Sequence, residues 1–191
     1  MCRAIRRVSG GIALALVWAC QSPPLVESGE GFRHARQGWS IAAPSRSHGG
    51  AVSGGPGSGW TQVSVPGSLI AYRQGGAGAA VWMTLSSRCS VSLAEPRLLA
   101  RHLRIGIPET TVRDAAPVSV GGAPGWEQRF DARDGATVVR LKTVTTVVEG
   151  CALDWVLSVG GDRDFGAAER DFDAWWQSFR PGPGASPGEV S

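Results

Sequence analysis

The chain lacks a strong charge of either sign. Its formal net charge is +3 at neutral pH, and three arginines, Arg3, Arg6 and Arg7, precede Cys20 with no acidic residue among them. The chain from Cys20 onward is therefore neutral, and Lys142 is its only lysine. A neutral chain has no overall field that would favour nucleic acid or an acidic membrane surface, so we expect no nucleic-acid partner.

The sequence also lacks the spacings that mark catalytic and metal sites. Its three histidines, His34, His48 and His102, lie far apart, and neither H-E-x-x-H nor G-x-S-x-G occurs. The segment around Asp162 and Asp164 lacks the residue order of a calcium loop, and either aspartate is better placed as the N-cap of a helix. We therefore predict no catalytic residue, no metal site and no cofactor.

No apolar run is long enough to cross a membrane. The longest, residues 12–19, falls well short of the roughly 20 residues that a helix needs to span the bilayer. Basic residues precede this run and Cys20 follows it, which is the order of an export signal with a short apolar segment. Residues 1–19 are therefore predicted to be a signal peptide.

The end of this run resembles the lipobox of bacterial lipoproteins, with Val17-Trp18-Ala19-Cys20 in the corresponding position. The resemblance implies that Cys20 becomes the mature N-terminus and carries a diacylglyceryl group and an N-acyl chain such as palmitate. Together these chains exceed the two signals that stable membrane anchoring needs. Gln21 favours sorting to the outer membrane, facing the periplasm. Cleavage after Ala19 by the ordinary signal peptidase stays open, because Trp18 is bulky for this motif.

Two of the four cysteines remain for the folded part of the chain. Cys2 belongs to the signal and Cys20 to the anchor, so Cys89 and Cys151 are an even pair in an oxidising compartment. A disulfide between them is favoured over two buried thiols, or a reactive or metal-binding pair, because neither lies in C-x-x-C or near a histidine. The bond would close a loop of roughly sixty residues and stabilise the fold by about 4 kcal/mol.

Composition divides the rest of the chain into three parts. Residues 20–36 are polar, with Pro, Gly and Ser, and are predicted to be the lipid anchor and a flexible tether. Residues 37–180 are predicted to form a single domain with a hydrophobic core, and residues 181–191 a disordered tail. Within the domain, the Gly- and Ser-rich residues 45–59 predict a surface loop, since no Gly-Lys-Ser/Thr accompanies them.

Alternating apolar residues predict most of the domain to be antiparallel sheet. The alternation is clearest at residues 151–159, where Cys151 and Trp155 share one face and Asp154 lies on the other. The polar positions around Arg140, Lys142 and Asp154 are interpreted as a solvated face in preference to a partner-binding surface. Further strands are predicted at residues 39–42, 60–65, 68–73 and 80–85, on either side of Pro117, and at residues 126–131 and 136–148, with turns at Asp134-Gly135 and Glu149-Gly150.

Two helices are predicted beside the sheet. The first begins at Ser92 with a capping box, has Pro96 in its first turn and ends at Gly106. His102 lies on this helix, where a surface or satisfied position is favoured over a catalytic one. Its predicted buried stripe is Leu98, Leu99, Leu103 and Ile105.

The second helix is predicted from Asp162 or Asp164 to Arg180. Its aromatic residues recur at helical spacing, which indicates core packing and not a cofactor site. These residues are Phe165, Ala168, Phe172, Trp175 or Trp176, and Phe179. The fold class is therefore predicted to be α+β, an antiparallel sheet of about six to seven strands with two packed helices.

This order of elements resembles the PsbP-like superfamily. The pieces that carry the resemblance are Gly59-Trp60, Ser87-Arg88-Cys89, Asp134-Gly135, Gly150-Cys151-Ala152-Leu153-Asp154 and the helix end from Phe172 to Phe179. The resemblance implies a small α+β sandwich, similar to uncharacterised bacterial envelope lipoproteins, in a superfamily whose members bind partners or assist assembly. We therefore expect a non-catalytic, membrane-anchored envelope protein with a protein partner. The alternative is a small envelope hydrolase with an unrecognised active site.

Overall fold

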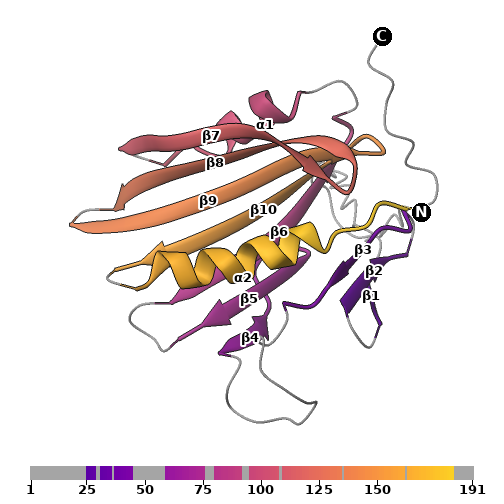
Figure 1. Cartoon of the computed structure of the whole chain (residues 1–191), viewed down its shortest axis with the longest axis horizontal. Helices are drawn as coiled ribbons and strands as arrows, with labels where there is room; N and C mark the ends of the chain where they lie inside the picture. The colour runs from indigo at the N-terminus through magenta and orange to yellow at the C-terminus, as the bar shows by residue number, and fades with distance from the viewer. Residues whose placement is uncertain are drawn as a thin grey trace, which may run out of the picture.

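A computed structural model describes residues 25–28, 31–35, 37–44, 59–75, 80–91, 95–107, 109–134, 136–161 and 163–182. These residues form a seven-stranded antiparallel sheet, a three-stranded sheet and two helices (Figure 1). The predicted α+β class is thereby confirmed. The elements are β1 Leu25–Ser28, β2 Gly31–His34, β3 Ser40–Ala42, β4 Trp60–Val63, β5 Ile70–Gln74, β6 Val81–Cys89, α1 Pro96–His102, β7 Thr110–Val120, β8 Ala123–Asp134, β9 Thr137–Val148, β10 Cys151–Gly160 and α2 Phe165–Gln177.

The large sheet is ordered β4-β5-β6-β10-β9-β8-β7, and tight turns connect β7 to β8 and β9 to β10. Glu149 and Gly150 join β9 to β10 with φ values of 49° and 72°, while Gly121 and Gly122 join β7 to β8 with φ values of 58° and 89°. Positive φ at both central residues is the type I′ geometry that matches strand twist. The predicted turn at residues 149–150 is present, whereas Gly135 lies outside the described residues.

The main core lies between the large sheet and α2, which crosses in front of the sheet in Figure 1. Asp164 caps this helix, because its side chain accepts a hydrogen bond from the backbone N–H of Ala167 at 3.2 Å. Five residues of the predicted stripe, or directly beside it, are buried: Ala168, Phe172, Trp175, Trp176 and Phe179. The sequence interpretation of this stripe as core is therefore confirmed.

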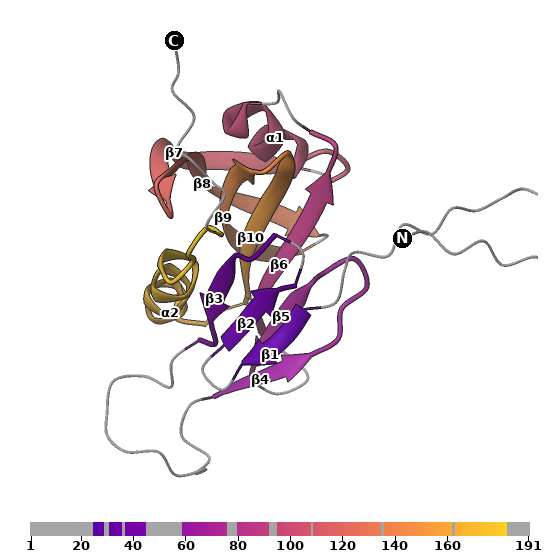
Figure 2. The same cartoon turned by 90° about the vertical axis from the view of Figure 1, so that its right-hand side faces the viewer.

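The shorter helix, α1, packs on the opposite face of the sheet. Neighbouring residues of a strand point to opposite faces, and on β8 Glu127 reaches the α2 side while Gln128 donates a hydrogen bond to the Ala100 carbonyl of α1 at 2.7 Å. Figure 2 views the sheet from its side, with the two helices well apart. The prediction that α1 begins at Ser92 was wrong, because the helix begins at Pro96 with Glu95 as its N-cap; Ser92 itself lies outside the described residues.

The predicted buried stripe of α1 was also wrong in part. Leu99 and Ala100 are buried, but the side chains of Leu98 and Ile105 are 49% and 75% exposed. A helix of this length makes only about two turns, so only a few of its side chains can contact the sheet. Ile105 follows the end of the helix, in a series of turns, and points away from the sheet.

The prediction of a flexible tether was wrong for the described residues between 25 and 34. There β1 and β2 form a hairpin, with Leu25 opposite His34. β2 also pairs with β3, and Phe32 and His34 are buried. The alternating burial of β2 explains the difference, because Phe32 supplies an apolar contact that a solvated tether would leave in water. The first described strand therefore begins at Leu25, inside the predicted tether.

Candidate functional site

Cys89 and Cys151 form a disulfide across the paired ends of β6 and β10. Their sulfur atoms are 2.14 Å apart, and the two residues face one another in the strand register. The side-chain amide of Gln37 donates a hydrogen bond to the sulfur of Cys151 at 2.9 Å. The pairing that the sequence predicts is therefore present, and it lies beside the small sheet.

Lys142 is a buried charged residue that lies on β9 beneath α2. Its ammonium nitrogen is 2.7 Å from Asp173 Oδ1, 3.0 Å from Glu169 Oε1 and 3.2 Å from Glu127 Oε2. The guanidinium of Arg129 lies 2.7 Å from the same oxygen of Glu169. We call these five side chains the Lys142 cluster; they join β8 and β9 to α2.

The Lys142 cluster corrects the interpretation of this strand face as solvated, because the Lys142 side chain is only 2% exposed. Burial alone would lower the pKa of Lys142, but the hydrogen bonds to Asp173 and Glu169 and the nearby charge of Glu127 outweigh it and raise that pKa. The ammonium therefore stays protonated at neutral pH. It serves as a fixed cation and cannot act as a general base there.

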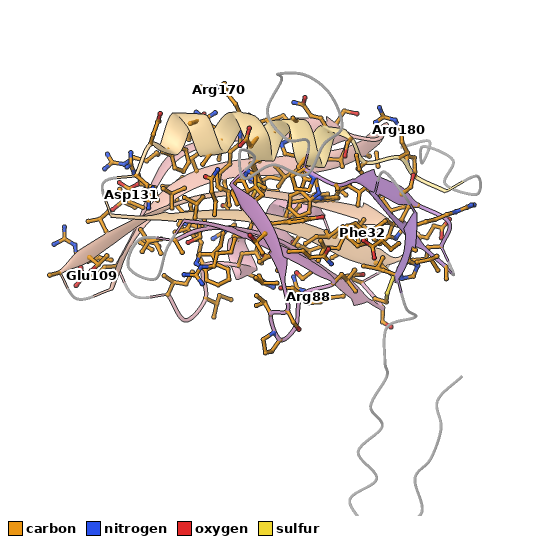
Figure 3. The ribbon with its side chains drawn as sticks, turned by 90° about the horizontal axis from the view of Figure 1, so that it is seen from below. Phe32, Arg88, Glu109, Asp131, Arg170 and Arg180 are labelled. Carbon is orange, nitrogen blue, oxygen red and sulfur yellow. A yellow bond between two sulfur atoms is a disulfide. The ribbon has the colours of Figure 1, made fainter. Side chains whose placement is uncertain are left out.

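A second buried charge, Asp154, lies on the opposite face of the sheet and is fully buried. It accepts a hydrogen bond from the Thr145 hydroxyl at 2.8 Å and forms an ion pair with Arg88 at 3.1 Å. Figure 3 shows Arg88 on one side of the sheet and α2 on the other. The expectation of a solvated position was therefore wrong for Asp154 as well, and its carboxylate oxygens are occupied by structural partners.

The histidines lie on different elements. His34 is buried on β2, where its ring stacks on Trp39 at 5.0 Å and its Nδ1 accepts the backbone N–H of Gln37. His102 is exposed at the end of α1, and His48 lies outside the described residues. Within the described ranges, no group of three His, Cys, Asp or Glu side chains is placed to hold a metal ion.

The surface of the described residues includes two open pockets. The first, of about 470 Å³, is lined by uncharged residues between β4 and β5, among them Gln62, Ser64 and Leu69. The second, of about 430 Å³, lies on α1 and the turn after it. Its lining residues are Leu98, Arg101, His102, Arg104 and Ile105. His102 therefore sits among arginines and aliphatic side chains.

The sequence interpretation missed this second pocket because it placed Leu98 and Ile105 in the core. One signal for it was present in the sequence: residues 96–107 contain three arginines and a histidine but no acidic residue. In a chain whose charges from Cys20 onward balance overall, such a segment indicates a local basic surface.

The solution structure of CyanoP, the cyanobacterial PsbP of Synechocystis sp. PCC 6803, aligns with 92% of this chain and 98% of its own, at a TM-score of 0.53 and 16% identity. The fold is PsbP-like. A protein of unknown function from Pseudomonas aeruginosa, a suggested regulator, aligns with 65% of this chain and 98% of its own, at a TM-score of 0.50 and 14% identity.

LpqN of Mycobacterium tuberculosis, a protein involved in cell envelope biogenesis, aligns with 65% of this chain and 79% of its own, at a TM-score of 0.46 and 12% identity. No family model and no curated protein matches the chain. At these identities the likeness concerns the fold alone. In the part of the chain that the structure describes, neither helix is long and apolar enough to cross a membrane.

Proposed function

We propose that the protein is a non-catalytic lipoprotein of the bacterial cell envelope, anchored through Cys20, that binds another protein or assists its assembly. The observation that carries the proposal is the disulfide between Cys89 and Cys151. Such bonds persist in oxidising compartments outside the cytosol, in agreement with the export signal of residues 1–19. Gln21 supports the outer membrane as the destination.

The use of the charged side chains supports a binding role over catalysis. The Lys142 cluster and the pair of Arg88 with Asp154 hold helices and strands together, and their polar atoms contact one another. His102 lines a surface pocket together with Arg101 and Arg104, and no carboxylate is among the lining residues. Turnover by the purified protein that His102→Ala abolishes without unfolding it would overturn this part of the proposal.

The first described strand starts close to Cys20 in the sequence, which makes the proposed anchor a short one. Only residues 21–24 separate Cys20 from β1. A fully extended chain advances at most about 3.6 Å per residue, so the five steps from Cys20 to Leu25 reach roughly 18 Å. The lipid at Cys20 would therefore hold the domain close to the membrane surface, and a partner would be met there.

The anchor is tested by Cys20→Ser, with Cys2→Ser as the matched control. We expect Cys20→Ser to block processing or to release the protein from the membrane fraction, because it removes the sulfur that carries the lipid. Cys2→Ser, which alters a cysteine of the signal, should leave processing and membrane attachment unchanged. The measurements are membrane fractionation and the intact mass of the mature protein.

A Cys20→Ser protein that remains membrane-bound and processed like the wild type would contradict lipidation. A mature N-terminus at Cys20 without added lipid mass would indicate cleavage by the ordinary signal peptidase. Crosslinking in intact membranes followed by mass spectrometry would identify the protein partner.

A further inference from the structure

We propose that the pocket on α1 docks the domain onto a bilayer surface that carries anionic lipid headgroups. The surface consists of Leu98, Arg101, His102, Arg104 and Ile105, and we call it the α1 face. The proposal rests on the proposed lipid anchor for its location, but its own basis is the geometry and charge of these five residues.

The α1 face combines exposed aliphatic side chains with basic ones. Only five large hydrophobic residues are exposed in the described part of the chain. Two of them, Leu98 and Ile105, line the same pocket. The other three lie on strands β1, β7 and β9. Clustered exposed apolar side chains mark interaction surfaces, whereas single ones need no explanation.

The backbone holds Ile105 in this exposed position. After α1 ends, the N–H of Arg104 bonds to the Arg101 carbonyl at 3.2 Å, and the N–H of Ile105 bonds to the His102 carbonyl at 3.0 Å. The N–H of Ile107 then bonds to the Arg104 carbonyl at 3.2 Å. These successive turns present Ile105 on the surface instead of folding it back onto the sheet.

The charge of the α1 face is not neutralised by its surroundings. Residues 96–107 contain no acidic residue, and Arg101 and Arg104 take part in no ion pair within the described ranges. A phosphate oxygen is a suitable acceptor for the guanidinium groups of Arg101 and Arg104.

A bilayer is the occupant that fits this combination best. Aliphatic side chains beside arginines are typical of surfaces that lie in the membrane interface, where the aliphatic groups enter the headgroup region and the arginines contact lipid phosphates. The short link from Cys20 to Leu25 would keep the domain near such a surface. The neutral charge of the whole chain from Cys20 does not oppose this, because only the local charge meets the headgroups.

The test places an environment-sensitive dye on the α1 face of the lipidated protein, reconstituted in vesicles. Ile105→Cys supplies a thiol for labelling, because Cys89 and Cys151 are paired. We expect a blue shift of the dye emission in vesicles with anionic phosphatidylglycerol, but not in purely zwitterionic vesicles. Val138→Cys is the matched control, since Val138 is exposed on β9 and shares the strand face of Lys142, opposite α1.

Charge is tested in the labelled Ile105→Cys protein by changing Arg101 and Arg104 to Gln. Each basic residue near an anionic surface contributes about a fivefold change in the docking equilibrium, so the double substitution should lower it about 25-fold. Arg133→Gln, which changes an exposed arginine on β8, should leave it unchanged. Added salt should weaken docking of the wild type, because it screens the attraction.

Equal shifts of the dye emission at positions 105 and 138, or no shift at position 105, would overturn the proposal. A crosslink from position 105 to an acidic protein, without any response of the dye to lipid, would also overturn it. A failure of the proposed lipid anchor is detected separately, from the mass of the mature protein. A mature protein without lipid mass at Cys20 would refute lipidation. Because its free Cys20 thiol would also take the dye, the α1 face is then tested with added anionic vesicles in a protein that combines Ile105→Cys with Cys20→Ser.

Discussion

Lys142 illustrates how a single residue can be charged and buried at once. Three carboxylates surround its ammonium group, so they compensate most of the hydration that the charge loses on burial. Arg129 in turn pairs with one of them, Glu169. One of those partners, Asp173, also accepts a hydrogen bond from the indole N–H of Trp176 at 2.9 Å. The Lys142 cluster thus connects the polar and the aromatic contacts that hold α2 on the sheet.

Lys142→Met is therefore expected to destabilise the protein by about 3–5 kcal/mol, because it leaves Glu127, Glu169 and Asp173 partly buried without their common cation. The measurement is urea unfolding followed by tryptophan fluorescence. The matched control is Arg140→Met, two residues earlier on the same strand face, where the guanidinium stacks on Phe165 and bonds to a backbone carbonyl near the surface. Similar losses for the two variants would contradict a special role for burial at Lys142.

The sequence could not reveal the burial of Lys142, although it predicted which residues of the strand share a face with it. Alternation along β9 separates Arg140 and Lys142 from Val139 and Leu141, but it does not show which elements cover either face. The covering residues Glu169 and Asp173 follow in a later helix. The disulfide was easier to predict, because counting cysteines and removing those of the signal leaves a single pair.

At the scale of elements, predictability follows length and periodicity. α2 has several turns, a capping aspartate and a regular aromatic stripe, so its position and buried side could be inferred from the sequence. α1 is short and begins at a proline, and its exposed Leu98 and Ile105 resemble core residues in pattern. β1 and β2 have four residues each, too few for a clear alternation, and were therefore assigned to a tether.

The packing of α2 is tested by Trp176→Ala, which should cost about 3–5 kcal/mol in the free energy of unfolding. The ring is buried, and its removal leaves a cavity and frees Asp173 from a hydrogen bond. The matched control is Gln177→Ala at the next, exposed position of the helix, for which a change below about 0.5 kcal/mol is expected. A loss under about 1 kcal/mol for Trp176→Ala would place the ring outside the core.

At the scale of the whole molecule, the last strand of the small sheet meets the residues that follow α2. Ser40 of β3 exchanges two backbone hydrogen bonds with Arg180, at 2.9 and 2.8 Å, just after α2. Trp39 and Phe179 are in ring contact at 5.8 Å, and Phe179 in turn contacts Trp155 of β10 at 5.4 Å. The small sheet is therefore joined to the large one through Phe179 and Arg180, so we expect the N-terminal hairpin to unfold together with the large sheet.

If the hairpin is structural, Phe32→Ala should lower the free energy of unfolding by about 3–5 kcal/mol, because Phe32 belongs to the buried core. Val26→Ala, on the exposed side of the same hairpin, should change it by less than about 0.5 kcal/mol. Both variants are measured by urea unfolding, with and without Cys20→Ser, which separates the stability of the fold from membrane attachment. A Phe32→Ala protein as stable as the wild type would mean that residues 25–34 behave as a tether after all. The domain could then move much farther from its lipid than residues 21–24 allow, and the α1 face would have no short link to keep it at the bilayer.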